Sequence, residues 1–582
     1  MAKISNNAFG GRRWRMIFAL LAVIFVFGAI IGRLTYLMRP WRNLRDAIVG
    51  RSRAFFDVAP AMRGNIYDRN GIPLAVSVPV FDIGVDPKLL SADEMDQIFN
   101  VLSARIGMPA REMEQKFENR LRQAPRSRWV LLANNISEDA YVGIMERKLH
   151  GIYGHRTSHR VYPQGTGACH LVGFLNAENA ACCGVEKFAD FFLRGQDGWI
   201  ISEKDGLRRE LVQYRSRDIP PVDGVDVLLT IDGVIQKIAE LELSNIEENF
   251  HPQFAVIIIS DAPTGKLLAL ACIPSYDPNH YNKAQEKAMR NRAVADIYEP
   301  GSVFKIVPIS VALEDGIVTP ETRFDCSVAT YDFNGKKYSL PKDHSELGDL
   351  SLVDVLRKSS NRGVAQIAIR IGADRFHTQA QVFGFGEKSG YGFDGDSAGI
   401  LKPPAQWDGL TITRMPMGHA IGATPMQMHL AMGILASEGY LFSPQIIEKI
   451  VPHGPGGGKM NEIIGQPIMR RQVLSRQTVR QMRSMLARPN DVRGLPFPIA
   501  FKTGTSQKLV NGRYVHDQHI PSCSGFFPAN NPMYLVTIVI DSPACAGTAW
   551  GDRYAKPSLF RIAEELSKYN SSFSENRHPQ KP

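Results

Sequence analysis

A serine and a lysine three residues apart, Ser302 and Lys305, have the types and spacing that nucleophilic catalysis requires. A proline-glycine pair precedes them and an apolar run follows, so the pattern predicts a helix with Ser302 in its first turn and Lys305 on the same face. A serine hydroxyl needs a neighbouring base, and a lysine amine can be that base once burial leaves it neutral. Alone the pattern is weak, because it recurs at Ser339 and Lys342 in a polar segment.

A second group, Ser359 and Asn361, follows a helical run. A hydroxyl and a carboxamide two residues apart can project together from a turn into a cleft, where Ser359 would relay a proton and Asn361 would bind an amide. Such a pair is more often a helix cap.

The third group is the run Lys502, Thr503, Gly504 and Thr505, which the pattern places on an extended strand before a hairpin. The lysine and the two threonines would set a cation and hydroxyls along one line, and Gly504 would let another backbone approach closely. The ordinary alternative is an edge strand with a solvated lysine.

One α+β domain is predicted to position these groups. Apolar strands are expected near residues 226–232, on both sides of a turn at 263–266 and at 533–541, a mainly helical block spans 300–440, and an amphipathic helix covers 557–569. This order predicts a central antiparallel sheet with helices on both sides.

Residues 16–32 are 17 residues without a charge, the lower limit for a membrane-spanning helix, and apolar residues up to 38 extend it. A cleaved signal peptide would have a shorter apolar run followed by small residues, so a retained signal anchor is favoured. Basic residues flank both ends equally and do not fix its orientation.

Residues 59–220 contain short elements and many turns, including an expected hairpin at Asn70-Gly71 and helical periodicity over 91–121. The predicted organisation is a cytoplasmic tail (1–15), a transmembrane anchor (16–38), an extended α/β pedestal (39–220), a catalytic domain (221–569) and a disordered tail (570–582).

The amino-acid composition excludes some classes of protein. The 582 residues are 44% apolar and 22% charged, with a net charge of +10 and seven cysteines. These values exclude a disordered chain and a disulfide scaffold, and the mild basicity does not by itself indicate a nucleic-acid partner. No spaced metal-ligand motif or phosphate-binding loop is present, so no cofactor or metal is expected.

The three groups occur in the order S-x-x-K, S-x-N and K-T-G, separated by 57 and 143 residues. This trio is typical of β-lactamases and penicillin-binding proteins. The chain resembles class B penicillin-binding proteins, the monofunctional peptidoglycan transpeptidases, along nearly its whole length. The motifs that carry the resemblance are RGNIYDRNGIPLA (63–75), VYPQGTGACHLVGF (161–174), GVEKFADFFLRGQDG (184–198), LTID (229–232), NRAVADIYEPGSVFK (291–305), TPMQM (424–428) and FKTGTSQK (501–508).

The resemblance implies a catalytic mechanism. Neutral Lys305 would take the proton of Ser302, which attacks the penultimate D-Ala carbonyl of a stem peptide. The backbone N–H groups of Ser302 and Thr505 would form the oxyanion hole, and Ser359 would pass the proton to the leaving D-Ala. Asn361 would hold the peptide amide.

In the same scheme, the K-T-G run would receive the terminal carboxylate through its lysine and threonines. An amine of a neighbouring stem peptide would then complete the cross-link, with carboxypeptidase activity as a possible side reaction. β-Lactams would acylate Ser302. Because the substrate lies outside the cytoplasmic membrane, the N-terminus would be cytoplasmic and the catalytic domain periplasmic or extracytoplasmic.

Three positions depart from the family pattern. Cys182-Cys183 replaces a stretch with an acidic residue, His419 replaces a tyrosine, and Gly551-Asp552 stands where two glycines are common. These departures lie in regions that support the site and leave the predicted reaction unchanged.

Other functions fit less well. A β-lactamase would need a residue that activates water for deacylation, and the expected glutamate-asparagine pair is missing after the second group. A β-lactam sensor would need several membrane helices and an H-E-x-x-H motif, and a bifunctional synthase would need a glycosyltransferase motif. An inactive divisome scaffold remains as a non-enzymatic alternative.

LAVSVPV at 74–80 and the compact length most resemble the septal, FtsI-type branch, with the elongation branch as the alternative. Glycan polymerisation must then come from a partner. The resemblance implies a glycosyltransferase of the SEDS family, together with divisome proteins. Arg63, Asp68 and Arg69 in the first motif suggest a charged docking surface on the pedestal, whereas the simpler alternative is a spacer that lifts the active site from the membrane.

Overall fold

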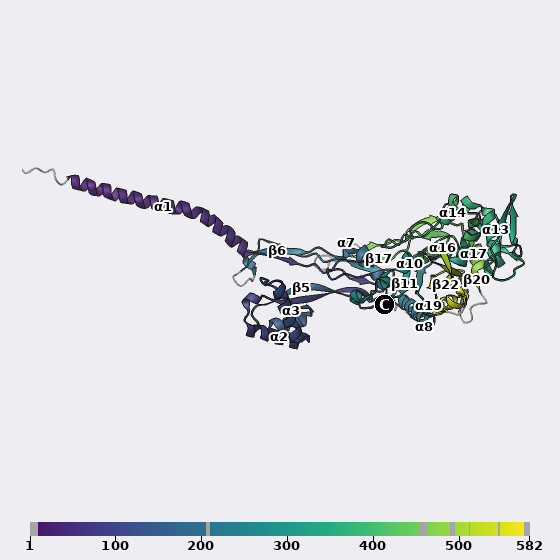
Figure 1. The fold of residues 1–582 in the computed structure, drawn as a ribbon, viewed down its shortest axis with the longest axis horizontal. Helices are drawn as coiled ribbons and strands as arrows, with labels where there is room; N and C mark the ends of the chain where they lie inside the picture. The colour runs from purple at the N-terminus through teal and green to yellow at the C-terminus, as the bar shows by residue number, and fades with distance from the viewer. Residues whose placement is uncertain are drawn as a thin grey trace, which may run out of the picture. The chain divides into compact units, whose positions relative to one another are not determined.

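The computed structural model describes residues 10–204, 210–452, 462–488, 495–510, 512–544 and 547–575 (Figure 1). The chain divides into two compact units. Unit 1 comprises Met1–Ala61 and Gln196–Val222, and unit 2 comprises Met62–Gly195 and Asp223–Pro582. The three predicted catalytic groups all belong to unit 2.

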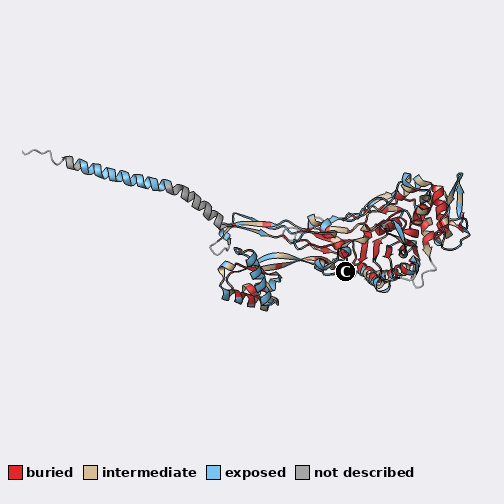
Figure 2. Ribbon diagram, viewed as in Figure 1, coloured by how far each residue is buried: buried red, intermediate tan, exposed pale blue. Residues whose placement is uncertain are grey.

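Unit 1 begins with a long helix, α1 (Gly10–Arg53). Its segment Trp14–Tyr36 has 23 residues with a mean hydropathy of 2.6 and no burial, as Figure 2 shows. An apolar helix of this length with nothing packed around it is suited to a membrane, in agreement with the predicted anchor. The unit also contains a small sheet in which β6 (Gly198–Lys204) pairs with β1 (Ala54–Ala59), β7 (Glu210–Leu211) and β8 (Arg217–Ile219).

The centre of unit 2 is a six-stranded antiparallel sheet in the order β11-β10-β23-β22-β21-β20. The predicted hairpin at 263–266 joins its first two strands, whose pairing runs from Ala255 with Ile273 to Ser260 with Leu267. The strands are β10 (Phe254–Asp261), β11 (Leu267–Ile273), β20 (Ala487–Arg488), β21 (Ile499–Val510), β22 (Arg513–Phe527) and β23 (Tyr534–Asp541).

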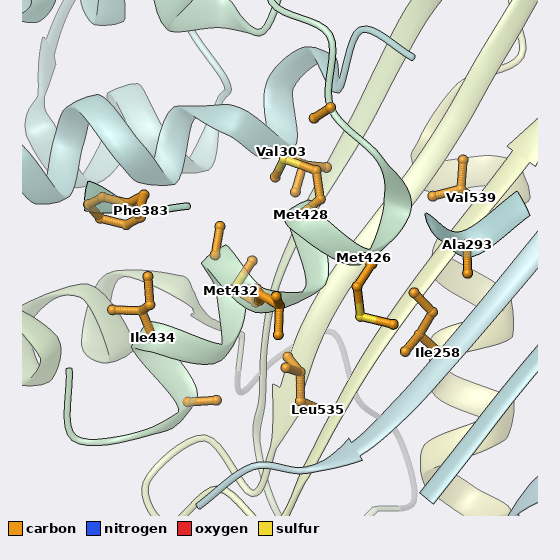
Figure 3. Packing of buried hydrophobic residues seen from close by; sticks show 14 of the residues in the cluster. Ile258, Ala293, Val303, Phe383, Met426, Met428, Met432, Ile434, Leu535 and Val539 are labelled. Carbon is orange, nitrogen blue, oxygen red and sulfur yellow. The ribbon is translucent and has the colours of Figure 1, made fainter. Parts of the chain in front are cut away.

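Both faces of this sheet are covered by helices, as the α+β prediction requires. Strand residues alternate between the faces. Val256 and Ile258 pack with the core that includes α11 (Ile306–Glu314) and α16 (Pro425–Ala436), where Met426 approaches the sheet (Figure 3). Ile257 and Ile259 face the opposite core, formed with α8 (Gly233–Phe250) and α19 (Lys556–Glu575).

The helical block contains further helices that carry the second catalytic group and its support. They are α12 (Leu352–Arg357), α13 (Asn361–Ile371) and α14 (Ala373–Val382), and a further helix, α17 (Arg476–Leu486), follows the block. Short hairpins such as β13 (Thr330–Phe333) with β14 (Lys336–Ser339) interrupt the block.

A second sheet of unit 2 joins N-terminal strands to later parts of the chain. Its order is β18-β17-β9-β2-β3-β4, with β5 paired to β3. The turn at Asn70-Gly71 links β2 to β3 as an antiparallel pair, in agreement with the predicted hairpin. The strands are β2 (Ile66–Tyr67), β3 (Pro73–Val85), β4 (Val130–Ile136), β5 (Ile152–Val161), β9 (Asp226–Leu229), β17 (Ile447–Val451) and β18 (Ile463–Ile464).

Two helix boundaries differ from the prediction. The helical stretch over 91–121 is two helices, α2 (Ala92–Ile106) and α3 (Ala110–Gln123), because Gly107 adopts a left-handed conformation that ends the first. At the C-terminus, α19 continues to Glu575, so residues 570–575 of the predicted disordered tail are helical. Serine and asparagine disfavour helix only modestly, and an established helix can therefore extend through them. Residues 576–582 lie outside the described part of the chain.

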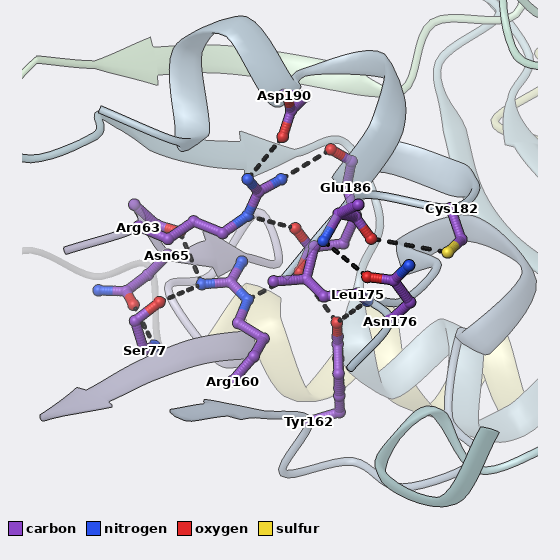
Figure 4. Close-up of polar contacts among 12 residues, drawn as sticks. Arg63, Asn65, Ser77, Arg160, Tyr162, Leu175, Asn176, Cys182, Glu186 and Asp190 are labelled. Carbon is purple, nitrogen blue, oxygen red and sulfur yellow. Dashed lines mark hydrogen bonds and ion pairs between the residues drawn. The ribbon is translucent and has the colours of Figure 1, made fainter. Parts of the chain in front are cut away.

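Unit 2 contains a buried ion cluster made by Arg63, Arg160 and Glu186 (Figure 4). Glu186, on α6 (Gly184–Phe188), is fully buried and accepts a hydrogen bond from Nε of each arginine, both at 2.7 Å. Arg160 also donates to the carbonyl oxygen of Gly64, and the Tyr162 hydroxyl donates to Glu186. The cluster therefore ties the first motif to β5 and α6.

This cluster corrects the expected docking surface. Arg63 is only 8% exposed, and it also pairs with Asp190, so its charge is used inside the protein. Asp68 is fully buried and accepts from the backbone N–H of Ile72 and of Gly233, which fixes the turn to the start of α8. Of the three charges, Arg69 alone is exposed.

Candidate active site

Ser302 and Lys305 lie in a short 3-10 turn, Gly301–Lys305, that leads into α11. The predicted single helix is thus a 3-10 turn followed by an α-helix. Gly301 has φ +56°, and a Cβ at this position would lie 2.9 Å from the carbonyl oxygen of Thr505. Glycine therefore allows the turn that carries the candidate nucleophile to press against β21.

The K-T-G run lies on β21 beside this turn. A Cβ on Gly504 would come within 2.9 Å of the Pro300 carbonyl oxygen, so Gly504 permits the close approach predicted from the sequence. On the side opposite β22, β20 pairs with β21 only at Ile499 and Ala500. Among the described strands, none pairs with this edge of β21 beyond Ala500, so the backbone of residues 501–505 has no strand partner on that side.

Ser359 and Asn361 lie at the junction of α12 and α13. Ser359 has φ +59°, a left-handed conformation that is uncommon for a residue with a side chain and costs energy. Lys305 Nζ donates to the Ser359 hydroxyl at 3.1 Å, to the Ser359 carbonyl, and to Asn361 Oδ1 at 2.7 Å. The turn therefore brings a hydroxyl and a carboxamide onto one lysine.

Lys502 approaches the same hydroxyl from β21. Its Nζ donates to Ser359 Oγ at 3.1 Å and to the Thr503 carbonyl at 2.9 Å. The Thr505 hydroxyl accepts from the backbone N–H of Gly551 at 2.9 Å, which fixes its orientation. The Ser359 hydroxyl thus lies between two lysines.

The two lysines are electrostatically perturbed. Lys305 is fully buried, and burial, reinforced by the charge of Lys502, holds the pKa of its amine well below the ordinary value. Burial lowers the pKa of Lys502 to about 8. The charge of Arg488 also lowers this pKa, whereas the charge of Asp552 raises it. A lysine whose neutral form is favoured can accept a proton.

Ser302 and the other groups border one cavity of about 320 Å³. Its lining includes Ser302, Ser359 and residues 502–505. Lys305 donates hydrogen bonds to both Ser359 and Asn361, which connects Lys305 and Asn361 to this cavity. All eight predicted site residues are therefore brought together, although they come from three distant parts of the sequence.

Asp343 supports the site and was not predicted. Its carboxylate accepts from the Ser360 hydroxyl at 2.8 Å and from the backbone N–H of Asn361. The neighbouring carbonyl of Lys342 accepts from Asn361 Nδ2 at 2.9 Å. The segment around Ser339 and Lys342, which repeats the S-x-x-K spacing, thus orients the group that contains Ser359 and Asn361. The sequence around Asp343 is polar and carries no signal that could have identified this role.

A second support joins Glu299, His419 and Tyr514. The Glu299 carboxylate lies 3.0 Å from His419 Nδ1 and accepts from the Tyr514 hydroxyl and the Ala420 backbone N–H. Because Glu299 precedes the turn of Ser302, these contacts hold that turn to two other segments. His419, a departure from the family pattern, therefore makes an ion-pair contact if it is protonated.

Residues 255–567 match the family described as "Penicillin binding protein transpeptidase domain", and residues 58–229 match "Penicillin-binding Protein dimerisation domain". Peptidoglycan D,D-transpeptidase FtsI of Escherichia coli (strain K12) is 30% identical over 558 residues, which cover 94% of this chain and 90% of the relative. Stage V sporulation protein D of Bacillus subtilis (strain 168) is 28% identical, with 95% and 85% covered.

Solved structures agree with the sequence matches. The crystal structure of penicillin-binding protein 3 from Mycobacterium tuberculosis complexed with ampicillin aligns with a TM-score of 0.64 at 26% identity, covering 90% of this chain and 99% of that one. Penicillin-binding protein 2X from Streptococcus thermophilus aligns with a TM-score of 0.73 at 19% identity, over 90% and 82%, and shares the fold. With a dimerisation domain ahead of a transpeptidase domain, this chain belongs to the class B penicillin-binding proteins.

Proposed function

We propose that this chain is a membrane-anchored peptidoglycan D,D-transpeptidase that forms a serine acyl-enzyme and is a target of β-lactams. The observation that carries the proposal is the buried amine of Lys305, bonded to Ser359 and Asn361 within the site that contains Ser302 and the K-T-G run. A buried lysine that lacks a carboxylate partner is suited to proton transfer.

Acylation begins when Lys305 takes the proton of Ser302. The Ser302 oxygen attacks the carbonyl of the penultimate D-Ala, and the backbone N–H groups of Ser302 and Thr505 stabilise the negative charge. The Ser359 hydroxyl then passes a proton to the leaving nitrogen. Its position between two lysine amines supports this role.

Substrate binding involves the remaining residues. Asn361 holds the peptide amide through its carboxamide. Lys502, Thr503 and Thr505 receive the terminal carboxylate, and Gly504 keeps the strand close to the nucleophile. An amine from a second stem peptide then attacks the acyl-enzyme, which releases Ser302 and makes the cross-link.

The activity is tested with fluorescent penicillin and with a peptidoglycan precursor. Purified chain should be labelled covalently and, beside a glycan polymerase, should produce cross-linked muropeptides. An inactive divisome scaffold would give neither product. A chain that binds penicillin but rapidly hydrolyses it would instead be a β-lactamase.

A septal role is the preferred assignment, with an elongation role in cell shape as the alternative. The relatives named FtsI support the septal branch. Depletion of the protein should give filaments if it acts in division, and round cells if it acts in elongation.

Among the described residues one helix segment, Trp14–Tyr36, is long and apolar enough to cross a membrane, and we assign it as a single span of the cytoplasmic membrane. We place its N-terminus in the cytoplasm and its catalytic unit in the periplasm or outside the membrane, because peptidoglycan is cross-linked there. A protease added to spheroplasts should digest the catalytic unit, whereas a cytoplasmic catalytic unit would be protected.

An enzyme that only cross-links needs new glycan nearby, and a tethered partner raises its local concentration. We therefore assign the partner as a SEDS-family glycosyltransferase that docks on the anchor and pedestal. Full-length chain should stimulate lipid II polymerisation by that partner, and removal of residues 1–58 should abolish the effect while penicillin labelling persists. Equal stimulation by both forms would leave the pedestal as a spacer.

Arg69→Glu tests the surface component of this docking, since Arg69 is exposed whereas Arg63 is committed to the internal cluster. The substitution should weaken stimulation and preserve labelling. Unchanged stimulation would remove Arg69 from the interface.

A further inference from the structure

The cavity beside Ser302 carries an excess of positive charge. Besides Lys502, four cationic side chains line it: Arg357, Lys358, Arg488 and Lys556. Among its described lining residues, Asp552 is the single acidic one. The K-T-G run would hold one terminal carboxylate, and a ligand with further carboxylates would match the sign of the other charges in this lining.

Two cavities divide β21 along its length. Residues 501–505 border the 320 Å³ cavity, and residues 507–509 border a second cavity of about 1230 Å³. Under the proposed function, the donor peptide has its terminal carboxylate at Lys502 and its reacting carbonyl at Ser302. The rest of that peptide must then continue away from the carboxylate, toward Gln507 and the larger cavity. The basic cavity therefore contains only the terminal D-Ala of the donor, and it empties when D-Ala leaves.

In the second half-reaction, the acceptor amine enters the cavity that the leaving D-Ala has vacated. Its nitrogen forms a bond to the ester carbon, and the bond from that carbon to Ser302 Oγ breaks. The proton lost by the nitrogen passes to the Ser359 hydroxyl and reaches Oγ through Lys305. This step is acylation in reverse with a different amine. The incoming nitrogen must therefore take the position that the D-Ala nitrogen left, and the body of the acceptor must extend into the basic cavity.

We infer that the cavity lined by Arg357, Lys358, Arg488 and Lys556 is the acceptor site, and that it selects an amine whose chain carries carboxylates beyond the one held by the K-T-G run. This inference rests on the proposed function and adds to it the charge class of the second substrate.

The cations differ in exposure. Lys358 is exposed at the end of α12 and can adjust to a ligand. Arg488 is half-buried, donates to the Arg357 carbonyl at 3.2 Å, and lies near enough to Lys502 to help lower its pKa. A partly buried cation and an exposed one can together bind a second carboxylate of the acceptor.

The experiment measures the ratio of transfer products when two amines compete for the acyl-enzyme. Full-length chain in detergent is acylated by a thioester that ends in D-alanine, and D-glutamate and D-lysine then compete as acceptors at equal concentration. Both share the D-α-amino acid centre and differ in side-chain charge. The ratio of the two transfer products does not depend on the acylation rate.

The wild-type chain should favour D-glutamate over D-lysine, and Lys358→Gln should lower the ratio by about two- to fivefold, as expected for one partly screened charge. Arg488→Gln should lower it further. The matched control, Lys337→Gln, removes an exposed lysine on β14 outside the cavity and should leave the ratio unchanged.

Equal use of the two acceptors by the wild-type chain, or the same ratio in Lys358→Gln as in the control, would overturn the acceptor assignment. Because Lys358 is exposed, its substitution does not threaten folding. Failure of penicillin and thioester to acylate the wild-type chain would instead overturn the proposed function, and the acceptor site with it.

Discussion

Two regions of unit 2 bury basic side chains for opposite purposes. In the ion cluster, Arg63 and Arg160 share the carboxylate of Glu186. In the catalytic site, Lys305 is also buried, but the described residues that accept its hydrogen bonds are a serine and an asparagine. A paired cation keeps its charge and stabilises the fold, whereas an amine without a paired carboxylate favours its neutral form and becomes a base.

The nearest acid illustrates the difference. Asp343 raises the pKa of Lys305, yet burial and Lys502 lower it more strongly. The carboxylate of Asp343 is occupied by the Ser360 hydroxyl and by the backbone N–H of Asn361 and Arg362. It thus orients the site without forming an ion pair with the base.

The largest effect is expected from Ser302→Ala, which removes the nucleophile. Covalent labelling by penicillin should be abolished while the fold remains, because the side chain is small and only partly buried. A gel with fluorescent penicillin and a circular dichroism spectrum measure the two outcomes. Persistent labelling would place the nucleophile elsewhere, with Ser339 the first residue to test.

Lys305→Ala should slow acylation by about 100- to 10,000-fold, since the base is lost. Lys305→Arg should not restore the rate, because a guanidinium remains charged at neutral pH. Stopped-flow acylation gives both rates. An arginine variant with a near-normal rate would exclude Lys305 as the base.

Glu186→Gln tests the paired region. It removes the carboxylate that Arg160 and Arg63 share, leaves Arg63 with Asp190, and should cost about 3–5 kcal/mol of stability. The matched control is Glu118→Gln, which removes an exposed ion pair with Arg122 and should cost about 0.5 kcal/mol or less. Urea unfolding of the full chain in detergent measures both, and equal midpoints for the two variants would remove the stabilising role of the cluster.

Asp343→Asn should change the pH profile more than the maximum rate. Acylation needs neutral Lys305, so kcat/KM falls as pH drops through its lowered pKa, and it falls again above about pH 8 as Lys502 loses the charge that attracts the carboxylate. Removal of the Asp343 charge should move the acid limb to lower pH and leave the basic limb in place. A purely structural role would lower the rate without moving the acid limb.

The architecture and the reacting residues could be predicted from the sequence, whereas the residues that orient them, such as Asp343 and Glu299, could not. Buried strands, the Asn70-Gly71 hairpin and the catalytic groups depend on local patterns, and the structure contains them. The partners of Asp343 and Glu299 depend on how distant segments meet, and no local pattern encodes that. Both residues occur in polar stretches, where an acidic side chain is usually solvated.

Arg63 was predicted to have a role that the structure does not support. Its charge beside a turn suggested an exposed docking residue, whereas its side chain is buried. Its partner lies 123 residues away, so the sequence around Arg63 alone could not reveal the burial. The domain limits and the residue roles remain predictions that the experiments above test.

The protonation state of Lys305 tests the central claim most directly. Lysine methylated with a ¹³C label, or labelled at Cε, can be titrated by NMR in the Ser302→Ala chain, with the Lys305 resonance assigned by its loss in Lys305→Arg. The account predicts that Lys305 titrates well below an ordinary lysine, whereas a Lys305 resonance that stays charged up to about pH 10.5 would contradict it.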